Sequence, residues 1–275
     1  GSKKFVIPDS IEGWSDAVGV LVSSYFMQDE LFPEYNAKNI KFDYSQIRPA
    51  GSPLKSSGGK APGPEPLKNA LSNIKKVLDK ALKDLDFCHE SIRKLKPVQA
   101  YDIVMHGADA VISGGVRRSA TICVFSPDDE EMAKAKTGNW FIENPQRGRS
   151  NNSALLLRDK TTKAQFSELM NSVKDFGEPG FVWSDSTELI VNPCVEIGMW
   201  PVDEKTGETG WQACNLSTIN CAKIKTEEDF YDACKAASII GTLQAGFDSF
   251  EYLGETSENI IKREALLGVS MTGIM

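Results

Sequence analysis

Strand-like and helix-like segments alternate along this chain, and that alternation restricts the folds it can adopt. Apolar residues recur at helical spacing in the segments 66–85, 97–112, 164–176 and 227–247. Short apolar runs typical of buried strands lie among them, at 120–125, 153–157, 181–183 and 266–271. Short loops join most of these segments. The pattern therefore predicts an α/β fold with a largely parallel sheet.

The first part of the chain combines a predicted helix with a loop rich in glycine and proline. Asp9 and Glu12 resemble a capping box ahead of a helical apolar pattern. The polar and aromatic segment 36–46 is predicted to be a loop. The next segment, 48–64, contains Pro49, Pro53, Pro62 and Pro64. Because each proline fixes its own φ angle, we favour a shaped binding loop over a flexible linker.

Composition indicates a globular protein, since 41% of the 275 residues are hydrophobic and 25% are charged. The net charge of −7 argues against a broad nucleic-acid surface, although local cations and backbone amides can still hold a phosphorylated ligand. No apolar run is long enough to span a bilayer, and no targeting segment is visible. We expect a cytoplasmic protein in which residues 1–4 are a terminus with the remnant of a removed tag.

The cysteines suggest a reducing compartment, because no secretion signal accompanies them. They are Cys88, Cys123, Cys194, Cys214, Cys221 and Cys234. No two form a Cys-x-x-Cys pair, and the chain has few histidines, so a structural zinc site is not expected. We assign His106 to helix packing, and Cys88, Cys221 and Cys234 to packing or exposure without function.

The segment 192–196 carries an unusual set of groups. If it is extended, Asn192, Cys194 and Glu196 share a face, because alternate residues of a strand point the same way. The amide can bind a substrate hydroxyl, and the carboxylate can take its proton. The thiol can act as a nucleophile or carry an oxidised state. On spacing alone, a buried structural cysteine beside a surface glutamate is the simpler explanation.

Two other motifs accompany this segment. Gly114-Gly-Val-Arg-Arg118 combines paired glycines, which let a ligand approach the backbone, with two arginines that can meet a phosphate. A turn with solvated arginines is the alternative, and the spacing matches neither a Walker loop nor a Rossmann fingerprint. Cys214-Asn-Leu-Ser217, taken alone, contains an ordinary strand cysteine.

Together, these motifs resemble the large catalytic subunit of ribonucleotide reductases. The resemblance covers nearly the whole chain from Phe5 to Met275, and several stretches are most similar to the adenosylcobalamin-dependent class II branch, including its phage-borne members. Those stretches are Val6-Ile-Pro-Asp-Ser-Ile-Glu-Gly-Trp14, Phe42-Asp-Tyr-Ser45, Ile47-Arg-Pro-Ala-Gly-Ser-Pro53, Arg147-Gly-Arg-Ser-Asn-Asn152, Asn192-Pro-Cys-Val-Glu-Ile197 and Leu267-Gly-Val-Ser-Met-Thr-Gly273.

The resemblance implies part of a ten-stranded α/β barrel with a central finger loop at about 190–200, in a single partial catalytic domain over 5–275. It implies reduction of ribonucleotides to 2′-deoxyribonucleotides through a thiyl radical on Cys194, which removes the 3′ hydrogen of the ribose. Glu196 matches the carboxylate that takes the 3′-hydroxyl proton, and Asn192 matches the amide that positions that hydroxyl. Cys214 matches one member of the redox pair that delivers two electrons at the 2′ position.

The resemblance also implies a coenzyme, an effector and a reductant. The coenzyme is adenosylcobalamin, the reductant is a thioredoxin-like dithiol, and the substrate is a ribonucleoside di- or triphosphate. Two loops, at about 47–64 and 113–119, match those that bind an allosteric deoxynucleotide. Their candidate contacts are Arg48, Ser52, Lys55, Gly114, Gly115, Arg117 and Arg118. Some relatives carry a small residue in place of Arg118, which leaves base selection by this loop open.

The chain departs from the family pattern at both ends. The family's partner of Cys214 lies upstream of Val6, and the later barrel strands and C-terminal thiols follow Met275. Cys123 does not take that partner's place, because it follows the arginine loop. We therefore expect a fragment, or one piece of a split or processed protein, that is inactive alone.

Three alternatives stay open. The chain can be a non-catalytic nucleotide-binding piece that completes a partner chain. It can be part of a class I large subunit, which needs a metal-radical partner protein. It can also be a plain thiol enzyme. The sequence does not distinguish a monomer from a dimer.

Overall fold

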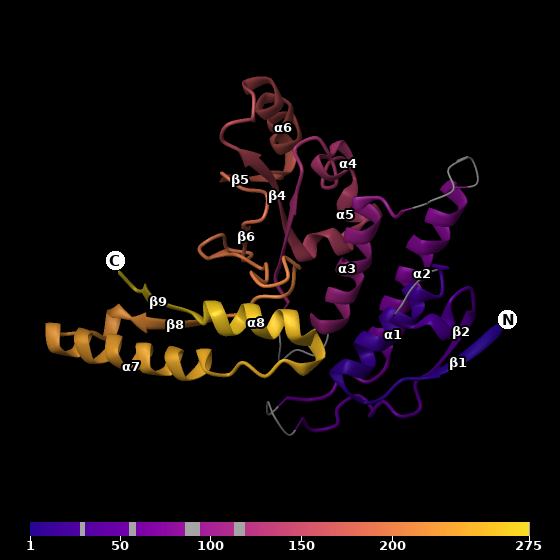
Figure 1. The fold of residues 1–275 in the computed structure, drawn as a ribbon, viewed down its shortest axis with the longest axis horizontal. Coiled ribbons are helices and arrows are strands. Elements are labelled where there is room, and N and C mark those ends of the chain that lie inside the picture. Colours follow the sequence, from indigo (N-terminus) through magenta and orange to yellow (C-terminus); the bar gives the residue numbers. More distant parts are fainter. Residues whose placement is uncertain (28–30, 55–58, 86–93, 113–118, 275) are drawn as a thin grey trace. The chain divides into compact units, whose positions relative to one another are not determined.

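The computed structural model describes residues 1–27, 31–54, 59–85, 94–112 and 119–274. They form two compact units, Gly1–Asp185 and Ser186–Met275 (Figure 1). Both units mix helices with short strands, as the alternation of the sequence predicts. None of the helices in the described residues is long and apolar enough to cross a membrane.

In the first unit, the elements follow one another in this order: β1 (Ser2–Val6), α1 (Ile11–Ser23), η1 (Pro33–Tyr35), β2 (Asn39–Asp43), α2 (Glu65–Leu85), α3 (Pro97–Ile112), β3 (Thr121–Phe125), α4 (Glu130–Ala133), α5 (Trp140–Glu143), η2 (Pro145–Arg149), β4 (Ser150–Leu157), α6 (Lys163–Phe176) and β5 (Gly180–Ser184). The second unit contains β6 (Ile190–Val191), β7 (Gly198–Met199), β8 (Cys214–Asn220), η3 (Cys221–Lys223), α7 (Glu227–Ala245), η4 (Glu251–Leu253), α8 (Gly254–Glu264) and β9 (Leu266–Thr272).

Strand pairing is largely parallel, which confirms the prediction. β1 pairs with β2, β4 lies between β3 and β5, and β8 pairs with β9, all in parallel. The exception among the described strands is the antiparallel pair β6–β7. Parallel pairs need connections long enough to cross back over the sheet, and helices supply them here.

Two local predictions for the first part of the chain were wrong. Segment 36–46 is not all loop, because β2 pairs in register with β1 and the rings of Phe5 and Phe42 meet edge to face at 6.2 Å. The long-range partner β1 decides this strand, which a local pattern does not reveal. The capping residue of α1 is Ser10, whose hydroxyl accepts from the backbone N–H of Gly13, whereas Asp9 pairs with Arg48.

The first unit has two apolar cores, one on each side of α3. The first packs α1 against α2 and is centred on Ile7, Leu67, Ile74 and Leu78, each at most 2% exposed. The second lies between the β3–β4–β5 sheet and the helices α3, α4 and α6. α2 carries its apolar residues on one face, and this face packs into the first core.

Ion pairs join α3 to the turn that precedes β4. The guanidinium of Arg147 binds both carboxylate oxygens of Asp102, at 2.8 and 2.7 Å, and both side chains are mostly buried. Farther along α3, Asp109 pairs with Arg149 at 2.6 Å. Because β3 begins where Thr121 pairs with Ser150, the described residues on both sides of segment 113–118 attach to the chain at 147–150.

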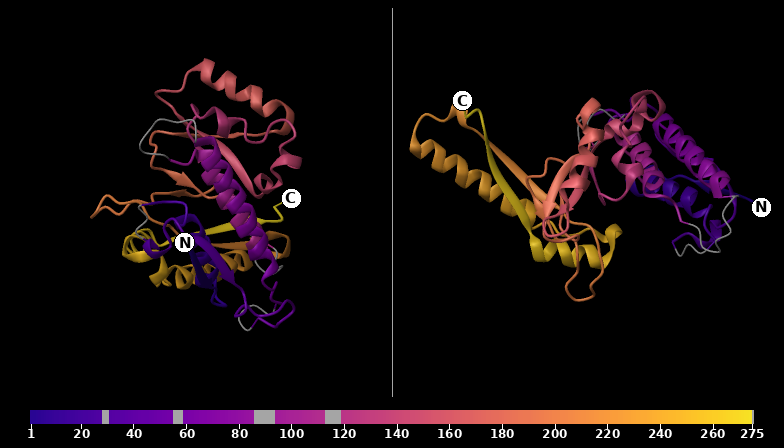
Figure 2. Two further views of the ribbon diagram at one scale, coloured as in Figure 1. Left: turned by 90° about the vertical axis from the view of Figure 1, so that its right-hand side faces the viewer. Right: turned by 90° about the horizontal axis from the view of Figure 1, so that it is seen from above.

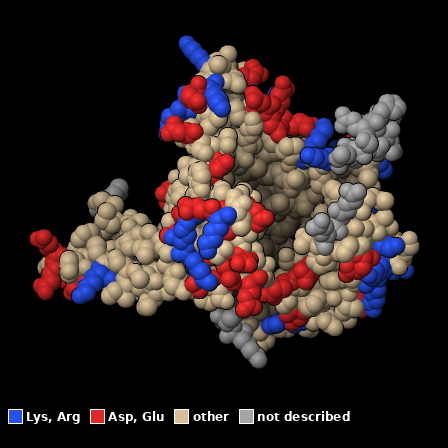
Figure 3. Space-filling model, viewed as in Figure 1, with Lys and Arg blue, Asp and Glu red and all other residues tan. Residues whose placement is uncertain are grey.

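In the second unit, α7 lies along β8 and β9 (Figure 2) and covers one face of the strand pair. Gly241 of α7 faces Leu267 of β9, and a Cβ at Gly241 would stand at an ordinary contact distance of 3.4 Å from it. Acidic side chains gather at the N-terminal end of α7 (Figure 3), where their negative charges interact favourably with the positive end of the helix dipole. Apolar residues on α7 and just after it stay exposed: Ile239, Ile240, Leu243 and Phe247. A two-stranded parallel sheet with such a surface is typical of part of a larger sheet.

We predict that Asp102→Asn lowers the free energy of unfolding by about 3 kcal/mol or more, because it leaves the Arg147 charge buried without its partner. Urea denaturation of the purified chain measures this loss. The matched control is Glu131→Gln, which removes an ion pair with Lys96 that is more than half exposed. That change should cost at most about 1 kcal/mol. Equal losses in the two variants would contradict a stabilising role for the buried pair.

Candidate active site

The residues 192–197 form the tip of a hairpin, so the expectation of an extended segment was wrong. Val195 donates its backbone N–H to the carbonyl oxygen of Asn192 at 2.9 Å, which closes a turn that contains Cys194. β6 and β7 continue from the two sides of this turn. The dipeptide Asn192-Pro193 is a turn signal that the extended interpretation overlooked. Cys194 is exposed at the tip.

Asn192 holds the turn closed through its side chain as well as its backbone. Its Oδ1 accepts from the N–H of Ile197 at 3.1 Å, and its own N–H donates to the carbonyl oxygen of Ile197 at 3.4 Å. The carbonyl side of this amide is therefore occupied by the loop. The amide nitrogen donates to no other residue that the structure describes, so it can face a ligand.

Val195 adopts a left-handed backbone conformation, with φ at 68°. A β-branched residue rarely does so, and the conformation costs roughly 1–2 kcal/mol. This strained residue stands directly between Cys194 and Glu196. It reverses the chain there, so the side chains of Cys194 and Glu196 are not arranged by the alternation of a strand.

Cys214 lies at the start of β8, as the strand pattern predicts, and it is half-buried. Burial raises the pKa of its thiol, and the negative charge of Glu196 raises it further. The hairpin and the strand therefore bring Glu196 close enough to Cys214 for their charges to interact. Three of the predicted catalytic residues, Asn192, Cys194 and Glu196, share one turn, and the fourth stands near it.

Cys123 occupies a different environment. It lies on β3, in register with Asn152 of β4, on the face that the helices of the first unit cover. Burial raises the pKa of its thiol, which makes it a poor participant in disulfide exchange. Nearby, the hydroxyl of Tyr101 bonds with Ser150 at 2.7 Å and donates to Asn152 at 3.1 Å, and burial raises the pKa of Tyr101 to about 12.

The first predicted effector loop has a defined shape in its described residues. Backbone bonds join Gly51 to Ala61 at 2.9 Å and Ala61 to Ser52 at 2.8 Å, and the hydroxyl of Ser52 donates to the carbonyl oxygen of Pro49. Arg48 is held by Asp9, with 2.6 Å between Nε and Oδ2. The other predicted contacts, Lys55, Gly114, Gly115, Arg117 and Arg118, lie outside the described residues.

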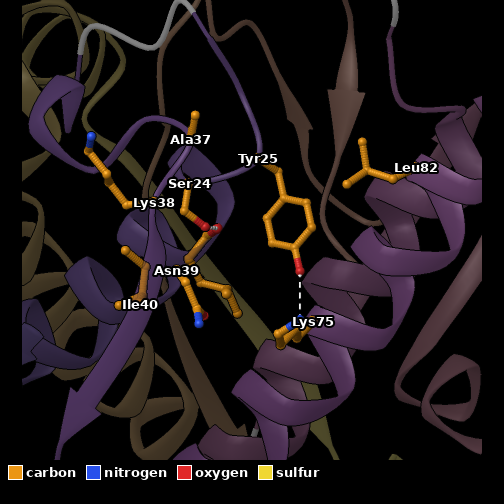
Figure 4. Close-up of a pocket in the computed structure, with 9 residues that line it drawn as sticks. Ser24, Tyr25, Ala37, Lys38, Asn39, Ile40, Lys75 and Leu82 are labelled. Atoms are coloured by element: carbon orange, nitrogen blue, oxygen red, sulfur yellow. Dashed lines mark hydrogen bonds between the residues drawn. The ribbon is translucent and has the colours of Figure 1, made fainter. Parts of the chain in front are cut away.

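Two cavities in the first unit lie near charged side chains. One of about 380 Å³ is lined by residues of α1, α2, β2 and the turns beside them, including Lys38, Asn39 and Lys75. In it, Tyr25 points its hydroxyl toward Lys75, which donates to it at 3.1 Å (Figure 4). A second cavity of about 240 Å³, between α2 and α3, is lined in part by His106, and burial lowers the pKa of this histidine.

The sequence interpretation did not identify the polar residues that position these elements. Asp102 and Asp109 recur on α3 at a spacing that puts both on one face, and Arg147 and Arg149 lie two residues apart ahead of β4. That charge pattern was a usable signal. Among the described residues, no group of three or more His, Cys, Asp or Glu side chains could hold a metal ion.

Comparison with known proteins confirms the resemblance to class II ribonucleotide reductases. A family model described as "B12-dependent ribonucleotide reductase, insertion domain" matches residues 2–78. A "Probable adenosylcobalamin-dependent ribonucleoside-triphosphate reductase" of Dictyostelium discoideum is 29% identical over 98% of this chain and 34% of its own length. The corresponding putative reductase of Mycobacterium phage D29 is 27% identical over 98% of this chain and 40% of its own length.

A solved structure supports the fold assignment. The crystal structure of a B12-dependent (class II) ribonucleotide reductase matches with a TM-score of 0.70 and 25% sequence identity. The match covers 99% of this chain and 36% of the other, so the α/β barrel of that enzyme is represented here in part. The chain spans about a third of the length of these relatives.

We predict that Glu196→Gln makes Cys214 react faster with iodoacetamide at neutral pH. The loss of the nearby negative charge lowers the pKa of the thiol. A larger fraction of Cys214 is then thiolate at neutral pH, and the thiolate is the form that reacts. Mass spectrometry of the Cys214 peptide measures the rate across a pH series. Cys123 serves as the internal control, because the charge that raises its pKa is that of Asp129. An unchanged pH profile for Cys214 would show that Glu196 does not act on it.

Proposed function

We propose that this chain, a relative of the B12-dependent class II ribonucleotide reductases, forms part of an enzyme that reduces ribonucleoside triphosphates to 2′-deoxyribonucleotides. The observation that carries the proposal is the turn at 192–197. It presents the Cys194 thiol at an exposed tip, carries Asn192 and Glu196 in the same turn, and brings Glu196 within electrostatic range of Cys214. The printed names of the relatives support triphosphates as the substrates.

Cys194 acts as the group that opens the ribose to reduction. As a thiyl radical it takes the hydrogen atom from C3′, so an S–H bond forms, a C3′–H bond breaks and one unpaired electron moves to the sugar. Glu196 accepts the proton of the 3′ hydroxyl. The free amide nitrogen of Asn192 donates a hydrogen bond to the same oxygen. A short closed turn suits this task, because its hydrogen bonds fix the backbone from which the three side chains project.

Cys214 supplies reducing equivalents at C2′. Exchange of the 2′ hydroxyl for hydrogen requires two electrons and two protons, and it releases one water molecule. Two thiols balance this requirement when they become a disulfide, so Cys214 needs a second thiol as its partner. Within the part of the chain that the structure describes, Cys123 does not suit that role, since its thiol faces the helix-covered core of the other unit. An external dithiol of the thioredoxin type would then restore both thiols.

Adenosylcobalamin is the coenzyme named for the relatives, and when bound it supplies radical chemistry. The residues described here fit that requirement in one respect. The Cys194 thiol lies at an exposed tip, where a bulky group can reach it. The contribution of this chain is to carry the thiol, to hold it beside Asn192 and Glu196, and to keep the turn short.

The effector loops belong to the same proposal. We assign the loop at 47–64, with Arg48, Ser52 and Lys55, and the loop at 113–119, with its glycines and arginines, to a deoxynucleotide that selects the substrate. The attachment of α3 and β3 to residues 147–150 supports this assignment, because it fixes the described residues on both sides of the second loop. Cytoplasmic location stays a prediction.

Two alternatives differ from the proposal in what they require. A class I subunit needs a metal-radical partner protein, and the relatives' dependence on adenosylcobalamin speaks against that assignment. A non-catalytic piece of a split reductase would contribute nucleotide binding alone. Addition of the missing parts of the enzyme separates this alternative, because activity that depends on Cys194 would contradict it.

We predict that the whole protein containing this chain reduces ribonucleoside triphosphates only when adenosylcobalamin and a dithiol are present, and that the 275-residue chain alone does not. Cys194→Ser should abolish turnover, and Glu196→Gln should lower kcat by about 10²–10⁴-fold through loss of the proton acceptor. Deoxynucleotide formation, followed by chromatography, measures both. Cys221→Ser, a thiol at the far end of β8, should leave the rate unchanged. Full activity of Cys194→Ser would refute the assignment.

A further inference from the structure

The hairpin that carries Cys194 needs support from outside itself. β6 and β7 contain two residues each and form one short ladder. Isolated hairpins of greater length are already marginally stable in water. The turn also contains the strained Val195, whose conformation persists only where its surroundings enforce it. The position of the hairpin must therefore be fixed at its base, where the chain leaves β7.

Arg263 of α8 binds the chain at that base. Its Nη2 donates to the carbonyl oxygen of Trp200 at 2.9 Å, and its Nη1 donates to that of Val202 at 2.7 Å. Trp200 directly follows β7, so the guanidinium grips the first carbonyl beyond the hairpin. Glu264 accepts from Nε at 2.9 Å and fixes the plane of the guanidinium. Such charge-assisted bonds are about twice as strong as neutral ones.

The same residue is tied to the strand of Cys214. Only Glu264 and Ala265 separate Arg263 from Leu266, and Leu266 is the register partner of Cys214 in the β8–β9 pair. One side chain therefore joins the base of the Cys194 hairpin to the end of the sheet where Cys214 lies. No interaction described for Asn192, Cys194 or Glu196 fixes this separation.

We propose that Arg263 is a positioning residue that sets the spacing between Cys194 and Cys214. The chemical consequence rests on the proposed function, whereas the spacing itself is a property of the fold. In the proposed reaction, the two thiols act on neighbouring carbons of one ribose, so their separation must be held closely. A misplacement of about 1 Å in such a site can cost about 10²-fold in rate.

A mutant cycle on the whole protein tests the spacing without any turnover. Iodoacetamide labelling of Cys214 is measured against pH in Glu196→Gln, in Arg263→Gln and in the double variant. We expect Glu196→Gln to speed the labelling when Arg263 is present and to have no effect when it is replaced, because the hairpin then no longer holds Glu196 near Cys214. The same effect of Glu196→Gln in both backgrounds would overturn the proposal.

Turnover supplies the second readout. Arg263→Gln should lower kcat by about 10²-fold with little change in KM, because substrate binding does not depend on the spacing of the thiols. Lys262→Gln on the same helix is the matched control, since Lys262 is half exposed and stands 3.9 Å from Glu258. It should keep full activity. Equal kcat values for Arg263→Gln and Lys262→Gln would also overturn the proposal.

Arg263→Lys keeps the charge but loses the two-pronged donor geometry of the guanidinium. It provides a second test if Arg263→Gln does not fold. A folded Arg263→Lys protein, checked by its thermal unfolding, should show a reduced effect of Glu196→Gln and an intermediate kcat. Wild-type behaviour in both measurements would count against the proposal. If the whole protein reduces no ribonucleotide, the proposed function fails, and the labelling cycle still decides the role of Arg263.

Discussion

The buried ion pair between Asp102 and Arg147 is the interaction on which the first unit most depends. It joins α3 to the turn before β4, and Arg147 also donates to the carbonyl oxygen of Ala135 at 2.8 Å, so three segments meet at one guanidinium. A buried charge without its partner is costly, so the loss of either side chain would strongly destabilise this junction. The second core forms around it, since Tyr101 of α3 bonds with Ser150 of β4 beside the pair. The described residues on both sides of segment 113–118 attach to the chain close to the same junction.

In the second unit, the fold gives the proposed chemistry its geometry through a small number of polar contacts. Asn192 closes the turn, Val195 takes an unfavourable conformation within it, and Arg263 holds its base. None of these contacts is hydrophobic, and within β6 and β7 only Val191 is buried. The site therefore depends on hydrogen-bond geometry, whereas the sheet and helices around it depend on burial. Substitutions can thus impair function here without unfolding the unit.

Much of the architecture was predictable because it follows from apolar periodicity. The helices that begin at Glu65, Pro97, Lys163 and Glu227, and the strands β3, β4, β5 and β9, lie where the sequence pattern indicates. β2 was missed because its partner β1 is distant in sequence. The resemblance implied a loop at about 190–200, but its closed turn at 192–197 was missed because alternation was given more weight than the Asn-Pro signal. Arg263 carries no local motif, and only the folded chain reveals which carbonyls it meets.

The turn around Cys194 has a consequence for how such a chain can vary over evolution. The backbone N–H and the side-chain oxygen of Asn192 both bond to the backbone of Ile197. These bonds fix the number of residues between Asn192 and Ile197. An inserted or deleted residue inside 192–197 would break this closure and displace the thiol. The segment 201–210 obeys a similar restriction, because Gly210 donates to the carbonyl oxygen of Pro201 at 2.9 Å and Asp203 donates to that of Glu208 at 2.8 Å. Natural length variation should therefore accumulate outside both of these closed turns, and not at the tip that carries Cys194.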